Sequence, residues 1–191
     1  MPVQIGTTSA SFADPTRLLS DCHRRIEMFL GALRTVAETG DHPLTEGARK
    51  SLEAALSYFR EAAPKHTADE EESLFPRLRR SENGEARFAL SRLDALEADH
   101  RNVAPLHAVV DELGRRYLNT GSLAPSEVIE FRVALDDLTR TYCEHIAEED
   151  ENVFPVAARL LSELDRRAIG KEMAARRNVP FMPTERQRQS G

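Results

Sequence analysis

An eleven-residue block occurs twice in this chain, and this repeat constrains the fold more than any other feature. The first copy, HTADEEESLFP, covers residues 66–76, and the second, HIAEEDENVFP, covers residues 145–155. Six of the eleven positions are identical. Each copy begins with a histidine followed four positions later by a glutamate, a spacing that places both side chains on one face of a helix. The repeat therefore predicts two similar helical stretches.

The duplication is longer than the block itself. His23 precedes His66 by 43 residues, and His100 precedes His145 by 45 residues. Apolar residues recur at helical spacing around all four positions, and no stretch alternates with the period of a strand. The sequence therefore predicts two helical hairpins, each with one histidine on its first helix and an H-x-x-x-E pair on its second.

Four long helices joined by short turns predict an all-α, antiparallel up-down four-helix bundle. The expected spans are Asp14 to about Gly40, about Thr45 to Arg80, about Ala86 to Tyr117, and Pro125 to about Leu161. A short additional helix is expected from Ser162 to Arg177. The resulting plan is a disordered lead over residues 1–13, the bundle over residues 14–161, and a short helix with a basic tail over residues 162–191.

Length and charge narrow the class of protein. A chain of 191 residues is one domain, and a net charge of −6 argues against nucleic acid as a partner. No apolar run is long enough to span a membrane, the first residues do not resemble a signal peptide, and two cysteines do not make a disulfide framework. We therefore expect a cytoplasmic protein. The basic C-terminal tail is either a docking site for the acidic surface of a protein partner or, in the plainer interpretation, a solubility tail.

Six inward-facing residues are the candidate metal ligands. They are His23, His66, Glu70, His100, His145 and Glu149. Burying two carboxylates among four imidazoles is costly unless cations offset it. Imidazole with carboxylate suits iron or manganese, and the lack of a cysteine pair on these faces argues against structural zinc. The set predicts two cations, iron or manganese, and leaves coordination positions for an exogenous ligand.

Other polar residues near the repeat are expected to have ordinary roles. His107 shares a face with His100 but lies two turns away, which favours a core or channel histidine over a ligand. Tyr142 is expected to face inward, and Cys22 and Cys143 are expected to be small buried residues rather than ligands. The acidic residues beside the two glutamates are expected on solvated flanks; they are Glu71, Glu72, Asp150 and Glu151.

These motifs, over roughly residues 14 to 160, resemble the hemerythrin-like, or HHE cation-binding, family of four-helix bundles with a non-haem di-iron centre. By that resemblance the four histidines would be terminal ligands, and Glu70 and Glu149 would bridge the irons. The oxygen carriers of the family have H-x-x-x-H on the third helix, whereas Ala104 stands four positions after His100. This difference disfavours simple oxygen carriage. The set is more similar to members linked to nitric-oxide stress, iron sensing and iron-centre repair.

We therefore expect a di-iron protein that binds a diatomic ligand, O2 or NO, for sensing, storage or stress response, and we assign no catalytic residue. The alternatives are a di-iron enzyme (a peroxidase, oxidase or NO reductase), an iron donor or repair protein, and a metal-free interaction bundle. A ferritin-like site is disfavoured because Glu97 and His100 form the single Glu-x-x-His match that this reading would need twice.

Overall fold

The computed structural model describes residues 12–84 and 86–182, and within them every regular element is helical. The elements are α1 (Pro15–Ala37), α2 (Glu46–Glu61), α3 (Ala63–Ala68), η1 (Asp69–Leu74), α4 (Phe75–Arg79), α5 (Ala86–Thr120), α6 (Pro125–Glu148), η2 (Glu149–Val153), α7 (Phe154–Leu160) and α8 (Glu163–Arg176). The predicted all-α class is confirmed. Most of the expected N-terminal lead, and the tail from residue 183, lie outside the described residues.

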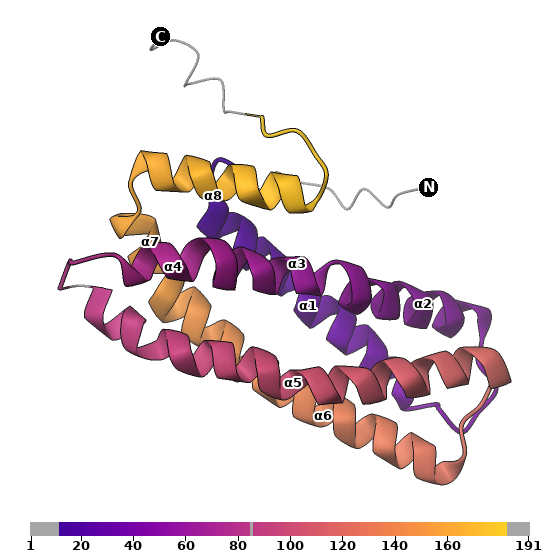
Figure 1. The fold of residues 1–191 in the computed structure, drawn as a ribbon. Helices are drawn as coiled ribbons and strands as arrows, with labels where there is room; N and C mark the ends of the chain where they lie inside the picture. Colours follow the sequence, from indigo (N-terminus) through magenta and orange to yellow (C-terminus); the bar gives the residue numbers. More distant parts are fainter. Residues whose placement is uncertain (1–11, 85, 183–191) are drawn as a thin grey trace.

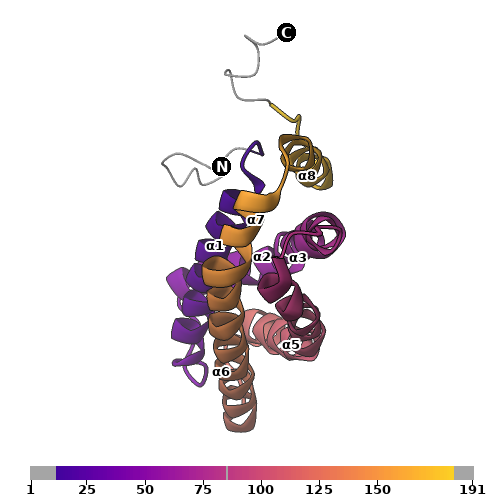
Figure 2. The same ribbon diagram turned by 90° about the vertical axis from the view of Figure 1, so that its left-hand side faces the viewer.

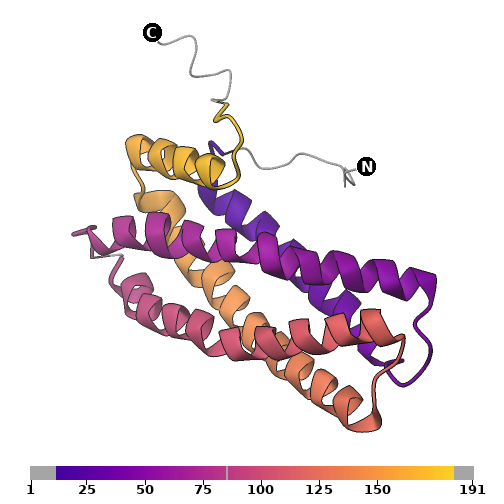
Figure 3. The same ribbon diagram turned by 45° about the vertical axis from the view of Figure 1, so that its right-hand side comes forward.

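Four helical arms make the bundle. The first arm is α1 and the third is α5, whereas the second runs through α2, α3, η1 and α4, and the fourth through α6, η2 and α7 (Figures 1 and 3). The antiparallel bundle expected from the sequence is therefore present, with two of its arms interrupted by π-helical segments. The additional short helix is α8, which packs outside the four arms against η1 and α1 (Figure 2).

Helix starts follow the polar residues that the sequence provides. The side chains of Asp14, Thr45 and Ser162 accept backbone N–H groups in the first turns of α1, α2 and α8. Pro15 and Pro125 occupy the first positions of α1 and α6, where a missing N–H costs nothing. These local signals fix where the arms begin.

The two hairpin turns lie against each other at one end of the bundle. The N–H of Leu44 donates to the carbonyl of Gly121 at 2.8 Å, and the N–H of Leu123 donates to the carbonyl of Gly40 at 2.9 Å. Gly121 has a φ of +81°, a conformation that favours glycine. The two duplicated halves are therefore joined through their turns as well as through their helices.

Two apolar clusters fill the core, one toward each end of the bundle. The first includes Leu30, Leu52, Phe131, Leu135 and Leu138, and the second includes Leu19, Phe75, Leu93, Val153 and Met173. The arms pass from one cluster to the other at the predicted ligand positions; His23, for example, lies between Leu19 and Leu30. The polar layer of the core therefore lies between two apolar ones. Over the described residues, none of the helices combines the length and apolar character needed to cross a membrane.

Candidate metal centre

The structure brings all six predicted ligands together. Their side chains form two groups of four, in each of which one donor atom per residue lies within 4.8 Å of the others. One group is His23, His66, Glu70 and Glu149, and the other is Glu70, His100, His145 and Glu149. The two glutamates belong to both groups. Five of the six residues are buried, and the side chain of His100 is 9% exposed.

Each shared carboxylate faces imidazoles from both halves of the chain. An oxygen of Glu70 lies 3.1 Å from Nε2 of His66, and its other oxygen lies 3.5 Å from Nε2 of His100. In the second half, Oε2 of Glu149 lies 3.3 Å from Nε2 of His145 and 3.1 Å from Nε2 of His23. Each glutamate thus connects its own helical arm to an arm of the other hairpin, which is the arrangement expected of a bridging group.

A widened helical turn carries each glutamate. The N–H of Phe75 donates to the carbonyl of Glu70, and that of Phe154 donates to the carbonyl of Glu149, five residues back rather than four. A proline follows each phenylalanine and lacks the N–H that a regular helix would use. Such π turns commonly occur at functional sites. Sequence reasoning missed them, although the repeated Phe-Pro pair marked their position.

The polar atoms of this layer lack partners of their own. Both carboxylate oxygens of Glu70 and of Glu149, and Nε2 of His23, are buried without a hydrogen-bond partner among the described residues. Leaving such atoms unsatisfied in the core is costly. Metal cations would supply the missing partners, so the donor set fits a pair of cations held between the histidines and the shared carboxylates.

The electrostatics of the cluster also favour cation binding. Burial, followed by the charge of Glu149, raises the pKa of Glu70 well above its usual value. Burial alone would raise the pKa of Glu149 too, but the imidazoles of His145 and His23, 3.3 and 3.1 Å from its Oε2, outweigh it and lower that pKa. Without cations, the surroundings therefore favour the neutral form of Glu70 and the ionised form of Glu149. Positive charge between them would let both ionise.

Three ligand-position histidines are oriented by carboxylates through their second nitrogen. Nδ1 of His23 lies 3.0 Å from Oδ1 of Asp150, and Nδ1 of His100 lies 2.8 Å from Oε1 of Glu71. Nδ1 of His145 lies 3.5 Å from a carboxylate oxygen of Asp99. Such contacts fix the ring and the tautomer of a metal-binding histidine.

These contacts correct one sequence expectation. Glu71 and Asp150 were expected on solvated flanks, yet their side chains are only 34% and 16% exposed, and each bonds to a histidine of the other hairpin. Their positions directly follow the two shared glutamates in the sequence, and there they meet a histidine on a neighbouring arm. Glu72 and Glu151 are exposed as expected.

Next to the centre, α8 is held by ion pairs to a carboxylate that sequence reasoning did not single out. Asp69 is fully buried, and its oxygens lie 2.9 Å from Nη1 of Arg176 and 2.6 Å from Nη2 of Arg177. Arg77 also binds both oxygens of Glu172 on α8. Two basic residues of the C-terminal region are therefore engaged inside the chain rather than free for a partner.

The remaining sequence candidates lie outside the two donor groups. His107 bonds to the hydroxyl of Tyr142 at 2.9 Å and belongs to neither group. Cys22 is buried as expected, but the expectation that Cys143 is buried is wrong, because this cysteine is exposed on the outer side of α6.

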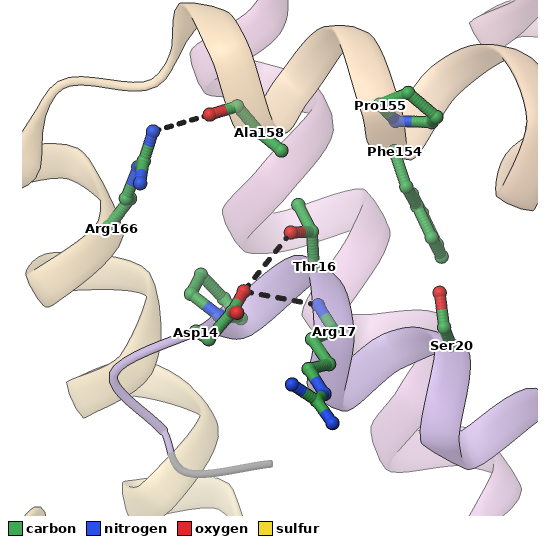
Figure 4. Close-up of a pocket in the computed structure, with 9 residues that line it drawn as sticks. Asp14, Thr16, Arg17, Ser20, Phe154, Pro155, Ala158 and Arg166 are labelled. Atoms are coloured by element: carbon green, nitrogen blue, oxygen red, sulfur yellow. Dashed lines mark hydrogen bonds between the residues drawn. The ribbon is translucent and has the colours of Figure 1, made fainter.

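A surface cavity of about 350 Å³, with Phe154 in its lining, lies between the start of α1, α7 and α8 (Figure 4). The ring of Phe154 stacks on His23, with centroids 5.3 Å apart. None of the six predicted ligands lines this cavity, so it is separate from the polar layer.

A four-helix bundle with a buried layer of histidine and glutamate defines the class as a cation-binding helical protein. The chain matches the hemerythrin HHE cation binding domain over residues 14–157 and belongs to that family. An uncharacterised protein of Haemophilus influenzae is 29% identical over 171 residues, which cover 89% of this chain and 94% of that protein. The resemblance stated from the sequence motifs is therefore confirmed.

Proposed function

We propose that this chain is a non-haem di-iron protein that binds a diatomic ligand, O2 or NO, at its irons, and that it acts in the cytoplasm. The observation that carries this proposal is the pair of four-donor groups sharing Glu70 and Glu149. In this proposal the four histidines would hold the ions as terminal ligands, and the two glutamates would be shared between the ions.

The donor chemistry supports iron, with manganese as the alternative metal. Each group offers two imidazole nitrogens and two shared carboxylates, and such a mixed set suits redox-active iron. Four protein donors per ion leave coordination positions open, and bound iron would supply the redox-active centre to which a diatomic molecule binds.

The protein's own contribution is a closed, largely apolar setting. One turn from the ligands lie Ile26, Ala63 and Val103, all buried, and the next turn adds Leu30 and Leu138. These side chains exclude water from that side of the centre, while the carboxylates on the second nitrogens hold three imidazoles in position.

Elemental analysis tests the proposal. The protein is reconstituted anaerobically with ferrous iron, desalted and analysed, and then exposed to O2, NO or azide while its absorption spectrum is followed. We expect two irons per chain and spectral changes on ligand addition. The double variant His66→Ala, His145→Ala is expected to retain fewer than one iron, whereas His42→Ala, at an exposed turn position, retains two.

Three outcomes would change the conclusion. Retention of no metal by the folded wild-type protein would contradict the proposal and favour an interaction bundle. Turnover of peroxide or nitric oxide well above that of free iron would favour a di-iron enzyme. Transfer of the iron to a second protein would favour an iron donor.

A further inference from the structure

The candidate ligands are of the same residue types in both halves of the chain. The carboxylates that contact the second nitrogens of the histidines form an outer layer, and part of this outer layer is repeated too. Glu71 follows Glu70 and bonds to His100 of the second half. Asp150 follows Glu149 and bonds to His23 of the first half. Each bridging position is therefore followed by a carboxylate that orients the single histidine of the other hairpin.

The duplication breaks at the other two histidines. Nδ1 of His145 faces Asp99, which directly precedes His100 in the sequence. The residue that directly precedes His23, at the equivalent position, is Cys22. Correspondingly, Nδ1 of His66 is buried and has no hydrogen-bond partner among residues 12–84 and 86–182. The first half therefore has a thiol at the sequence position equivalent to Asp99, and no carboxylate bonds to Nδ1 of His66.

This replacement has a predictable effect on metal affinity. A carboxylate on the second nitrogen fixes the ring and increases the basicity of the coordinating nitrogen, and losing such a contact typically costs 10- to 100-fold in affinity. A thiol is a weak acceptor. His66, at 4% exposure, is also too buried to recover the loss by bonding to bulk water.

The outer charges differ in the same direction. Asp150 shares its charge with Arg24, whose Nη2 lies 2.6 Å from Oδ2 of Asp150. Glu71 and Asp99 have no ion pair with any arginine or lysine of the described ranges. Among the carboxylates on the second nitrogens, the two that contact His100 and His145 are therefore not paired with an arginine or lysine of the described residues. The single one on the other side, which contacts His23, is neutralised by an arginine.

We infer that the two metal positions differ in affinity. The ion held by His23 and His66 is bound more weakly and exchanges readily, whereas the ion held by His100 and His145 is bound more tightly. This inference rests on the proposed function. It adds that the duplicated centre has one stable and one labile position, distinguished by Cys22 in one half and Asp99 in the other.

Release kinetics test the inference. The protein loaded anaerobically with ferrous iron is mixed with an excess of a ferrous chelator, and the coloured complex is followed with time. We expect two phases of one equivalent each, with rate constants that differ by at least about tenfold. Asp150→Asn is expected to accelerate the fast phase alone, and Glu71→Gln the slow phase alone.

Two exchanges between the halves make the test specific. Cys22→Asp introduces the missing carboxylate and is expected to slow the fast phase about tenfold. Asp99→Cys gives the second half the residue that the first half has at the equivalent position. This variant is expected to accelerate the slow phase by a similar factor. Asp99 is 39% exposed, so this variant should fold even if Cys22→Asp does not. Cys143→Asp, at an exposed cysteine, is the control and should leave both phases unchanged.

The inference and the proposed function fail in different ways. Release of two equivalents in a single phase, or acceleration of only the fast phase by Asp99→Cys, overturns the inference while the di-iron proposal stands. If the folded protein retains neither iron nor manganese, both are overturned.

Discussion

The Nε2 atom of His107 lies 2.9 Å from the hydroxyl oxygen of Tyr142, inside the bundle and beyond the layer of candidate ligands. The ring of Phe59 packs on the imidazole with centroids 5.1 Å apart. At the equivalent positions of the first half the chain has Leu30 and Ala63, so this polar pair exists in one half alone. Burial lowers the pKa of His107 to about 4, and the imidazole is therefore neutral at pH 7.

A neutral buried histidine makes the stability of the metal-free protein depend on pH. In the unfolded chain His107 takes up a proton near pH 6.5, whereas in the folded chain it does so only near pH 4. The unfolded state is therefore favoured as the pH falls through this window. As the pH falls through this window, protonation of His107 in the unfolded chain lowers the free energy of unfolding by up to about 1.4 kcal/mol per pH unit.

His107→Leu, which copies Leu30 of the first half, should remove this part of the pH dependence. The measurement is urea denaturation of the metal-free variant and wild type at several pH values between 4.5 and 6.5. His42→Asn, at an exposed turn position, is the control and should keep the wild-type slope. Equal slopes for His107→Leu and wild type would contradict the assignment of a buried, neutral imidazole.

The ion pairs that hold α8 should contribute far more to the free energy of unfolding than ion pairs on the surface do. Removing both cations with Arg176→Ala, Arg177→Ala leaves the fully buried carboxylate of Asp69 uncompensated, with an expected loss of about 3–5 kcal/mol in the free energy of unfolding. The repeat places Glu148 at the equivalent position, paired with Arg92, whose side chain is 47% exposed.

Arg92→Ala is therefore the matched control and should cost less than about 1 kcal/mol. Denaturant unfolding of the three proteins gives the comparison. An equal loss of unfolding free energy in the two variants would contradict the expectation that burial of Asp69 makes its ion pairs contribute more than the pair of Arg92.

Two helical glycines should respond to alanine with opposite signs. A Cβ atom at Gly170 of α8 would collide with the backbone carbonyl of Phe12, which cannot move aside as a flexible side chain would. Gly170→Ala should therefore destabilise the protein by about 1–3 kcal/mol. Gly31 in α1 has nothing within 4 Å of an added Cβ, so Gly31→Ala should stabilise it by about 0.5–1 kcal/mol. Thermal unfolding of both variants checks the signs, and stabilisation by Gly170→Ala would contradict the packing of this segment on α8.

The inner layer of the centre could be predicted from sequence because its geometry is local. A histidine and a glutamate four residues apart share a helix face whatever the rest of the fold does. The duplication then indicated that two such faces meet. Glu70 and Glu149 were therefore found together with their histidines.

The outer layer could not be predicted, because it depends on how separate arms pack. The helical wheel correctly places Glu71 and Asp150 beside the two shared glutamates, but their partners come from α5 and α1. The contact of Arg176 with Asp69 joins residues 107 positions apart and has no local signal. The π turns are local, but the sequence signal for them, a proline after phenylalanine, also fits an ordinary helix start.

Metal retention should fall as the solution is acidified, because imidazoles coordinate metals only when unprotonated. Burial lowers the pKa of His23, but the nearby carboxylates of Asp150 and Glu149 outweigh it and raise the pKa overall. The balance for His145 is the same, with Glu149 as the main carboxylate. Protons therefore compete with the metal mainly at His23 and His145, whereas burial lowers the pKa values of His66 and His100. We expect two irons per chain at pH 7 and progressive loss below about pH 6.

Iron content after desalting at stepped pH, with circular dichroism at each step, measures this loss separately from unfolding. The loaded protein should also melt at a higher temperature than the metal-free protein at pH 7, because binding to the folded state alone stabilises it. That difference should shrink as the pH falls, since the bound fraction falls with it. An unchanged iron content between pH 7 and pH 5 in the folded protein would contradict histidine ligation, and it would leave the two carboxylates as the groups that hold the metal.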